Sequence, residues 1–286
     1  MLAGDSLANN DAYAIEDRIL HYVDKLNAAH IAQHGGQYKG FAEIRNGYAY
    51  VTAQDDQDLA GNGSITRAVE VVESAGTVHI SAGTFVEQVI VDGKRVTLQG
   101  QGEQTVIKSP TGMLAGSFTA GGAVYRPVVM VTNSDQAVIR DLKVDGNDNG
   151  QNNGQFLGVG YYNASGTIEN LDVVNVRSSD SSGIQTGRAI YGRAEGDARQ
   201  LNITNNRIAN YQKNAIELHG SSLTAVVADN TMDGGGETSV IGRNGIVIRD
   251  GASGSVVSNT VSGHHFVDTA SAQATASGIL LYYSGV

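Results

Sequence analysis

The sequence contains no cysteine, which excludes disulfide bonds, thiolate metal sites and cysteine nucleophiles. It has no apolar run long enough to span a bilayer, and no basic segment followed by an apolar one opens the chain. We therefore expect no membrane insertion. If the parent protein is exported, its signal is expected to lie outside this sequence.

Charged residues are also scarce, at 17 % of the 286 residues, and the formal net charge is −10. A negative chain is repelled by nucleic-acid backbones, so we expect no nucleic-acid partner. There are only two prolines but 37 glycines, and Asn, Ser, Thr, Gln and Asp are abundant. This composition is typical of short strands, many turns and a polar rather than ionic surface.

A six-residue pattern recurs along the second half of the chain. An apolar residue is followed by two variable residues, a Leu or Asn, a variable residue and a second apolar residue. Its copies begin at 139, 168, 203, 227 and 256 and are 29, 35, 24 and 29 residues apart, about one turn of a three-sided coil. Asn206, Asn230 and Asn259 take the fourth position in three successive copies, where we expect stacked amides to pair with turn backbone.

A second segment repeats at the same pace. It occupies Ala189–Arg193, Ala215–His219, Gly245–Arg249 and Gly278–Tyr282. Strand alternation turns the isoleucine of each segment inward, and stacked coils bury these residues in a column that no single coil could hide. The column is Ile190, Ile216, Ile246 and Ile279. We predict an all-β fold, a right-handed parallel β-helix solenoid with an N-terminal segment of helix and hairpin.

The N-terminal part has a different pattern. Apolar residues at helical spacing predict a helix over 12–34, a strand pair is expected around Gly47–Thr52, and a short helix is expected over Ile65–Ser74. We divide the chain into 1–63, which precedes or packs on the solenoid, and 64–286, the solenoid itself. Residues 278–286 read as a strand in mid-pattern, so we expect the solenoid to be open at its C-terminal end.

The first coils resemble a known superfamily. The segment Thr66–Glu87, followed by Val89–Val91, Val96–Gly102 and Thr105–Ile107, is similar to the opening coils of the pectin-lyase-like superfamily, and to β-helix modules of giant bacterial exoproteins. The resemblance covers about residues 64 to 286 and implies the fold. It implies no chemistry, because that superfamily contains lyases, hydrolases, esterases, epimerases and adhesins. The motifs of its enzyme families are absent, and only Gly263-His264-His265 resembles one of them.

The second repeat also predicts an outward column of side chains. It contains Arg193, His219, Arg249 and Tyr282, with Tyr191 and Glu217 beside it. Guanidinium groups bind carboxylates and aromatic faces stack on sugar rings, so the column is a candidate ligand-binding face. His219 beside Glu217 and Arg249 could act as a general acid or base. The alternative is a solvated sheet face with incidental pairs between coils.

Two groups of residues have the chemistry of metal ligands. Asp145 and Asp148 belong to a polar loop whose oxygens could hold Ca²⁺, although an ordinary loop has the same composition. His264 and His265, with Asp268, could coordinate a transition metal if the chain turns there. We predict no other cofactor.

The absence of enzyme motifs favours a non-catalytic module of a large exported protein, secreted or at a bacterial cell surface. Such a module would act as a rigid stalk or as a carbohydrate-binding adhesion scaffold. Its expected partners are a polysaccharide or cell-surface glycan, neighbouring domains of the parent chain, and a second copy at the open coil end. The alternative is a polysaccharide lyase or epimerase that acts on uronate-containing glycans.

Overall fold

The computed structural model describes Tyr13 and residues 42–45, 47–53, 64–179, 182–267 and 275–283. Apart from Tyr13, the helix predicted at 12–34 lies outside the described residues, and so does Asp268. Within the described part, no helix is long and apolar enough to cross a membrane.

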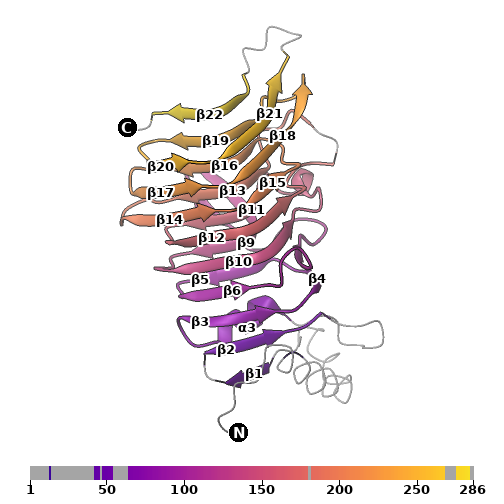
Figure 1. Cartoon of the computed structure of the whole chain (residues 1–286), viewed down its shortest axis with the longest axis vertical. Helices are drawn as coiled ribbons and strands as arrows, with labels where there is room; N and C mark the ends of the chain where they lie inside the picture. The colour runs from indigo at the N-terminus through magenta and orange to yellow at the C-terminus, as the bar shows by residue number, and fades with distance from the viewer. Residues whose placement is uncertain are drawn as a thin grey trace.

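Short parallel strands stack into two sheets along the long axis of the molecule (Figure 1). The first sheet has two faces, because the long strands β10 (Ala137–Asp145) and β12 (Gly166–Val174) bend at a corner and belong to both. One face adds β2 (Tyr48–Val51), β3 (Gly76–Ile80), β6 (Val96–Gln99), β14 (Arg199–Thr204), β17 (Leu223–Ala228) and β20 (Ser253–Val257). The other adds β4 (Gly83–Val86), β7 (Thr105–Lys108), β15 (Arg207–Ala209), β18 (Thr231–Thr238) and β21 (Thr260–Phe266).

The second sheet closes the third side of each coil. Its parallel strands are β5 (Val89–Asp92), β9 (Ala123–Thr132), β11 (Gln155–Tyr162), β13 (Arg188–Arg193), β16 (Asn214–His219), β19 (Asn244–Arg249) and β22 (Ser277–Tyr282). A short antiparallel strand, β8 (Phe118–Ala120), pairs with the start of β9, and a 3₁₀ turn lies at Gly150–Asn152. The predicted all-β parallel β-helix is thus confirmed.

Both repeats of the sequence are in register between coils. Ile190 pairs with Ile216, Ile216 with Ile246, and Ile246 with Ile279 in the second sheet. In the first sheet the same holds for the column Ile139, Ile168, Ile203, Val227 and Val256. The first three isoleucines of the second-sheet column belong to one continuous apolar core, and each such side chain stabilises the fold by about 1.5–3 kcal/mol.

The predicted asparagine ladder is present at the corner between the two faces of the first sheet. Oδ1 of Asn230 accepts from the backbone N–H of Asn206 at 3.0 Å and from its Nδ2 at 2.8 Å. Oδ1 of Asn259 accepts the same two bonds from Asn230, at 3.0 and 2.9 Å. Each amide also donates to a strand carbonyl, so the ladder satisfies backbone groups that the bend removes from the sheet.

The short helix α3 (Ile65–Val71) ends earlier than the predicted Ser74. At its start, Ser64 accepts from the N–H of Arg67, and the carboxylate of Glu87 accepts from the N–H of Ile65 at 2.8 Å. At its end, the ammonium of Lys94 donates to the carbonyl of Val69 at 2.7 Å, and Val72 is extended. At this end the ammonium of Lys94 donates to a helix carbonyl that the backbone N–H of a further helical residue would otherwise bind.

The N-terminal strand pair is continuous with the solenoid. β1 (Ala42–Arg45) is antiparallel to β2, and β2 is parallel to β3 with Val51 opposite Ile80. The first sheet therefore begins before residue 64, whereas the division of the chain at that residue stays a prediction.

A tight approach between coils makes Gly166 the basis of a stability test. A Cβ at Gly166 would lie 1.8 Å from the carbonyl oxygen of Ala137, whereas one at Gly154 would meet nothing within 4 Å. We expect Gly166→Ala to lower the free energy of unfolding by about 1–3 kcal/mol, because β10 and β12 must move apart. Gly154→Ala should leave it unchanged or raise it slightly. Urea unfolding of both variants measures the difference, and equal midpoints would contradict this packing.

Candidate functional site

The outer face of the second sheet has three columns of side chains in register. In β13 the outward positions are Arg188, Tyr191 and Arg193, which lie opposite Asn214, Glu217 and His219 in β16. The next strands continue these columns with Asn244, Val247 and Arg249, and then Ser277, Leu280 and Tyr282. The predicted column from Arg193 to Tyr282 therefore exists, and its members differ in what covers them.

The hairpin of β8 and β9 covers the first part of this face. The ring of Phe118 stacks on Tyr162 with centroids 4.8 Å apart, and Tyr125 stacks on Tyr191 at 4.9 Å. Tyr191 is fully buried as a result. The sequence suggested that this ring could stack on a sugar, but in the structure it already packs against Tyr125.

Arg193 lies under the turn of the same hairpin. A Cβ at Gly121 would be 3.2 Å from both terminal nitrogens of its guanidinium, and Arg193 also forms an ion pair with Glu195. Glu195 in turn accepts a 2.9 Å bond from the hydroxyl of Tyr162. Arg193 is therefore held by groups of this chain and is only 12 % exposed.

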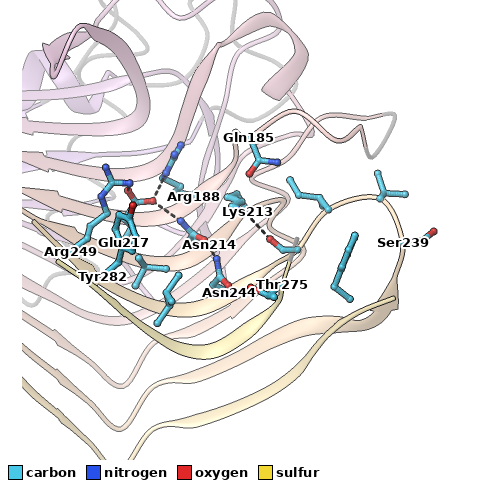
Figure 2. A pocket seen from close by; sticks show the side chains of 16 residues that line it. Gln185, Arg188, Lys213, Asn214, Glu217, Ser239, Asn244, Arg249, Thr275 and Tyr282 are labelled. Carbon is cyan, nitrogen blue, oxygen red and sulfur yellow. Dashed lines mark hydrogen bonds and ion pairs between the residues drawn. The ribbon is translucent and has the colours of Figure 1, made fainter. Parts of the chain in front are cut away.

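A pocket of about 690 Å³ lies over β16, β19 and β22 (Figure 2). Glu217, Asn214 and Asn244 lie on its floor, and Arg249 and Tyr282 line it at the C-terminal ends of β19 and β22. The segment Ser239–Gly242 lines the pocket as a wall before the first residue of β19, and Phe266 also lines the pocket. Further lining residues are Gln185, Arg188, Lys213, Val247, Thr275 and Leu280.

Glu217 is the centre of the polar network on the floor, and its side chain is 3 % exposed. Its Oε2 accepts from Nε of Arg188 at 2.5 Å and from Nδ2 of Asn214 at 2.5 Å. Nη1 of Arg249 lies 3.8 Å from Oε1. Asn244 donates to Oδ1 of Asn214 at 2.9 Å, which orients that amide toward Glu217.

Lys213 adds a third cation to the pocket. Its ammonium donates to the carbonyl oxygen of Gly242 at 2.8 Å, which ties the wall to the start of β16. Burial lowers the pKa of Lys213, and the nearby charge of Arg188 lowers it further, whereas Glu217 acts in the opposite direction. The charged side chains that line the described part of the pocket are thus Arg188, Lys213 and Arg249, with Glu217 as their carboxylate.

His219 faces a different partner from the one suggested by the sequence. It is buried, and its Nε2 lies 2.5 Å from Oδ2 of Asp250, an oxygen that also accepts from Nε of Arg249 at 3.0 Å. His219 is not among the described residues that line the pocket. It therefore contacts the site indirectly, through the carboxylate that holds Arg249.

We expect stability to fall as the pH drops below about 6.5, partly because of His219. Burial lowers its pKa from 6.5, and the charges of Arg193 and Arg249 lower it further. The unfolded chain then takes up this proton at a higher pH than the folded chain does, so acid favours unfolding. His219→Gln should flatten the pH dependence of the urea midpoint in this range. His265→Gln should not, because the side chain of His265 is 64 % exposed. Identical slopes in the two variants would contradict the prediction.

The residues suggested as metal ligands have other partners. Asp145 accepts from Nδ2 of Asn175 at 3.0 Å, and Asp148 pairs with Nε of Arg177 at 2.7 Å. Nε2 of His264 is hydrogen-bonded to the hydroxyl of Tyr211, and His265 lies 3.4 Å from Glu237. Among the described residues no three His, Asp or Glu side chains are grouped as a metal site would need, and Ca²⁺ binding stays a prediction.

The columns predicted from the sequence did not include Arg188, Asn214 and Asn244. All three precede the repeated isoleucine by two positions, and regular alternation would place them on the same face as the isoleucine, so the repeat did not mark them as pocket residues. Lys213 and the wall had no periodic signal either, because they belong to loops of unequal length. No protein-family model and no curated protein sequence matches this chain.

Proposed function

We propose that this chain is a non-catalytic β-helix module of a large exported surface protein, and that its pocket binds an acidic sugar of a polysaccharide or cell-surface glycan. The observation that carries the proposal is the charge of the pocket. Among the described residues that line it, three are cations and one is a carboxylate, although the chain as a whole has a formal charge of −10. A local reversal of sign attracts an anion to this place on the surface.

The polar groups of the pocket fit a sugar that bears a carboxylate. The side chain of Arg249 is 37 % exposed, and because its Nε donates to Asp250, its two terminal nitrogens are the pair that can bind a ligand carboxylate. The ring of Tyr282 is 50 % exposed and offers a face for stacking.

The test is calorimetric titration with short uronate oligomers and with neutral oligomers of the same length. We expect only the uronates to bind, and Arg249→Ala to weaken binding at least about tenfold by removing a charged contact. Arg207→Ala is the matched control, because Arg207 is 63 % exposed on the first sheet. Equal binding of neutral sugars, or no binding of uronates, would contradict the proposal.

A second function, elimination or epimerisation of uronates, is favoured by Lys213. Its lowered pKa leaves more of Lys213 unprotonated near neutral pH than of an ordinary lysine, so it is more available as a general base, and Arg249 is placed to neutralise a substrate carboxylate. Glu217 is less suited to this role because Arg188 and Asn214 occupy Oε2. Incubation with uronate polymers, followed by ultraviolet absorbance of unsaturated ends and by NMR of the sugar configuration, tests this. Turnover that is lost in Lys213→Met would replace the non-catalytic proposal.

A further inference from the structure

We infer that the pocket receives the end of an acidic glycan chain rather than an internal stretch of it. The inference rests on the proposed function and adds the part of the ligand that is recognised. It follows from two obstacles: the β8–β9 hairpin, which covers the neighbouring part of the sheet face, and the wall at Ser239–Gly242, which lines the pocket.

The first obstacle blocks the direction along the stack of coils. Successive strands of a sheet are about 4.8 Å apart, so a sugar chain that follows the stack from Glu217 would next lie over β13 and β11. That surface is occupied by the hairpin of β8 and β9: Tyr125 covers Tyr191, the residue opposite Glu217, and Phe118 covers Tyr162. The rings of Tyr125 and Tyr191 belong to a buried cluster with Met130. A ligand cannot continue there without displacing this packed cluster.

The second obstacle blocks the direction along the strands. Ser239–Gly242 stands before the first residue of β19 and lines the pocket from that side (Figure 2). It is anchored at two points, since Gly242 accepts from the ammonium of Lys213 at 2.8 Å and the side chain of Ile241 is buried. The wall is therefore part of the folded solenoid, and a ligand must stop at it.

Charge is concentrated near these two obstacles. Arg188 is at the start of β13, the strand whose Tyr191 is covered by the hairpin, and Lys213 precedes β16 at the same end of the strands. Arg249 and Tyr282 are in later strands and at the opposite ends of those strands. A glycan would therefore place its terminal carboxylate near Arg188 and Lys213 and leave the pocket past Arg249 and Tyr282.

The experiment counts binding sites against chain ends. A linear polyuronate is titrated before and after partial cleavage at constant mass, and oligomers of one to four residues are titrated beside it. We expect the number of protein molecules bound per unit mass to rise in proportion to the chain ends, and affinity to level off within these short oligomers. Lys213→Met should weaken oligomer binding at least about tenfold, and the matched control Lys143→Met, whose ammonium pairs with Asp172 on the first sheet, should not.

Modification of the oligomer ends provides a second arm. In one set of oligomers the reducing end is reduced to an alditol, and in another the sugar at the non-reducing end is methylated. Because the pocket should receive only one end of the chain, one of these two modifications should abolish binding and the other should leave binding intact. If the amount bound per unit mass is unchanged by cleavage, or if neither modification matters, internal segments are recognised and the inference is wrong while the proposed function stands. If no uronate binds in any form, the proposed function itself is wrong.

Discussion

Glu217→Ala is expected to lower the free energy of unfolding by about 3–5 kcal/mol, because it leaves a buried guanidinium without its counter-charge. Arg188 is 11 % exposed, and its Nε lies 2.5 Å from the carboxylate that the substitution removes. Asn214 loses its acceptor at the same time. Urea unfolding followed by circular dichroism measures the loss.

Two variants serve as controls for this prediction. Glu169→Ala removes a carboxylate from an exposed pair, 3.7 Å from Arg140, and should cost no more than about 1 kcal/mol. Glu217→Gln keeps the shape and an acceptor for Arg188, so its cost should be smaller than that of Glu217→Ala. If Glu217→Ala and Glu169→Ala cost the same, the buried network is not what stabilises the floor of the pocket.

Asn230→Ala is expected to cost about 2–5 kcal/mol, because it interrupts the asparagine ladder in its middle. The backbone N–H and the amide of Asn206 lose their acceptor, and the carbonyl of Ile203 loses its donor. A buried polar group left without a partner costs about 1–3 kcal/mol. The unfolding midpoint in urea reports the loss, and a change in the slope would show that the coils no longer unfold together.

The ladder prediction also has a matched control. Asn202 lies in β14 of the same coil as Asn206, but its side chain is exposed, so Asn202→Ala should change stability by no more than about 0.5 kcal/mol. Asn230→Asp keeps the acceptor for Asn206 but buries a carboxylate against the carbonyl of Ile203 and Oδ1 of Asn259, so it should cost at least as much as Asn230→Ala. A cost for Asn202→Ala equal to that of Asn230→Ala would mean that the ladder has no special part in stability.

The fold was predictable because its determinants repeat. Ile190, Ile216 and Ile246 recur at the pace of one coil, and strand alternation then decides which way each side chain points. Asn206, Asn230 and Asn259 marked the corner for the same reason. The end of α3 was not predictable, because a carbonyl in its last turn binds Lys94, which is 23 residues beyond the last helical residue, Val71.

The site was only partly predictable. Glu217, Arg249 and Tyr282 were recognised from the outward columns and do line the pocket. Tyr191 and Arg193 belong to the same columns, yet the hairpin at Phe118–Tyr125 covers one and contacts the other. The sequence of β13 could not predict this cover, because the hairpin belongs to a connection two coils earlier in the chain.

The sequence by itself determined the coil, its register and the direction of the repeated isoleucines, because these follow from a period that every coil obeys. Only the tertiary structure decided which part of the outer face is open. Exposure there depends on two irregular connections, the β8–β9 hairpin and the wall at Ser239–Gly242. The hairpin covers β13, which is distant from it in the sequence, whereas the wall lies next to β19, the strand that follows it. The positions of these connections result from packing against the folded solenoid, and a periodic sequence pattern does not predict such contacts.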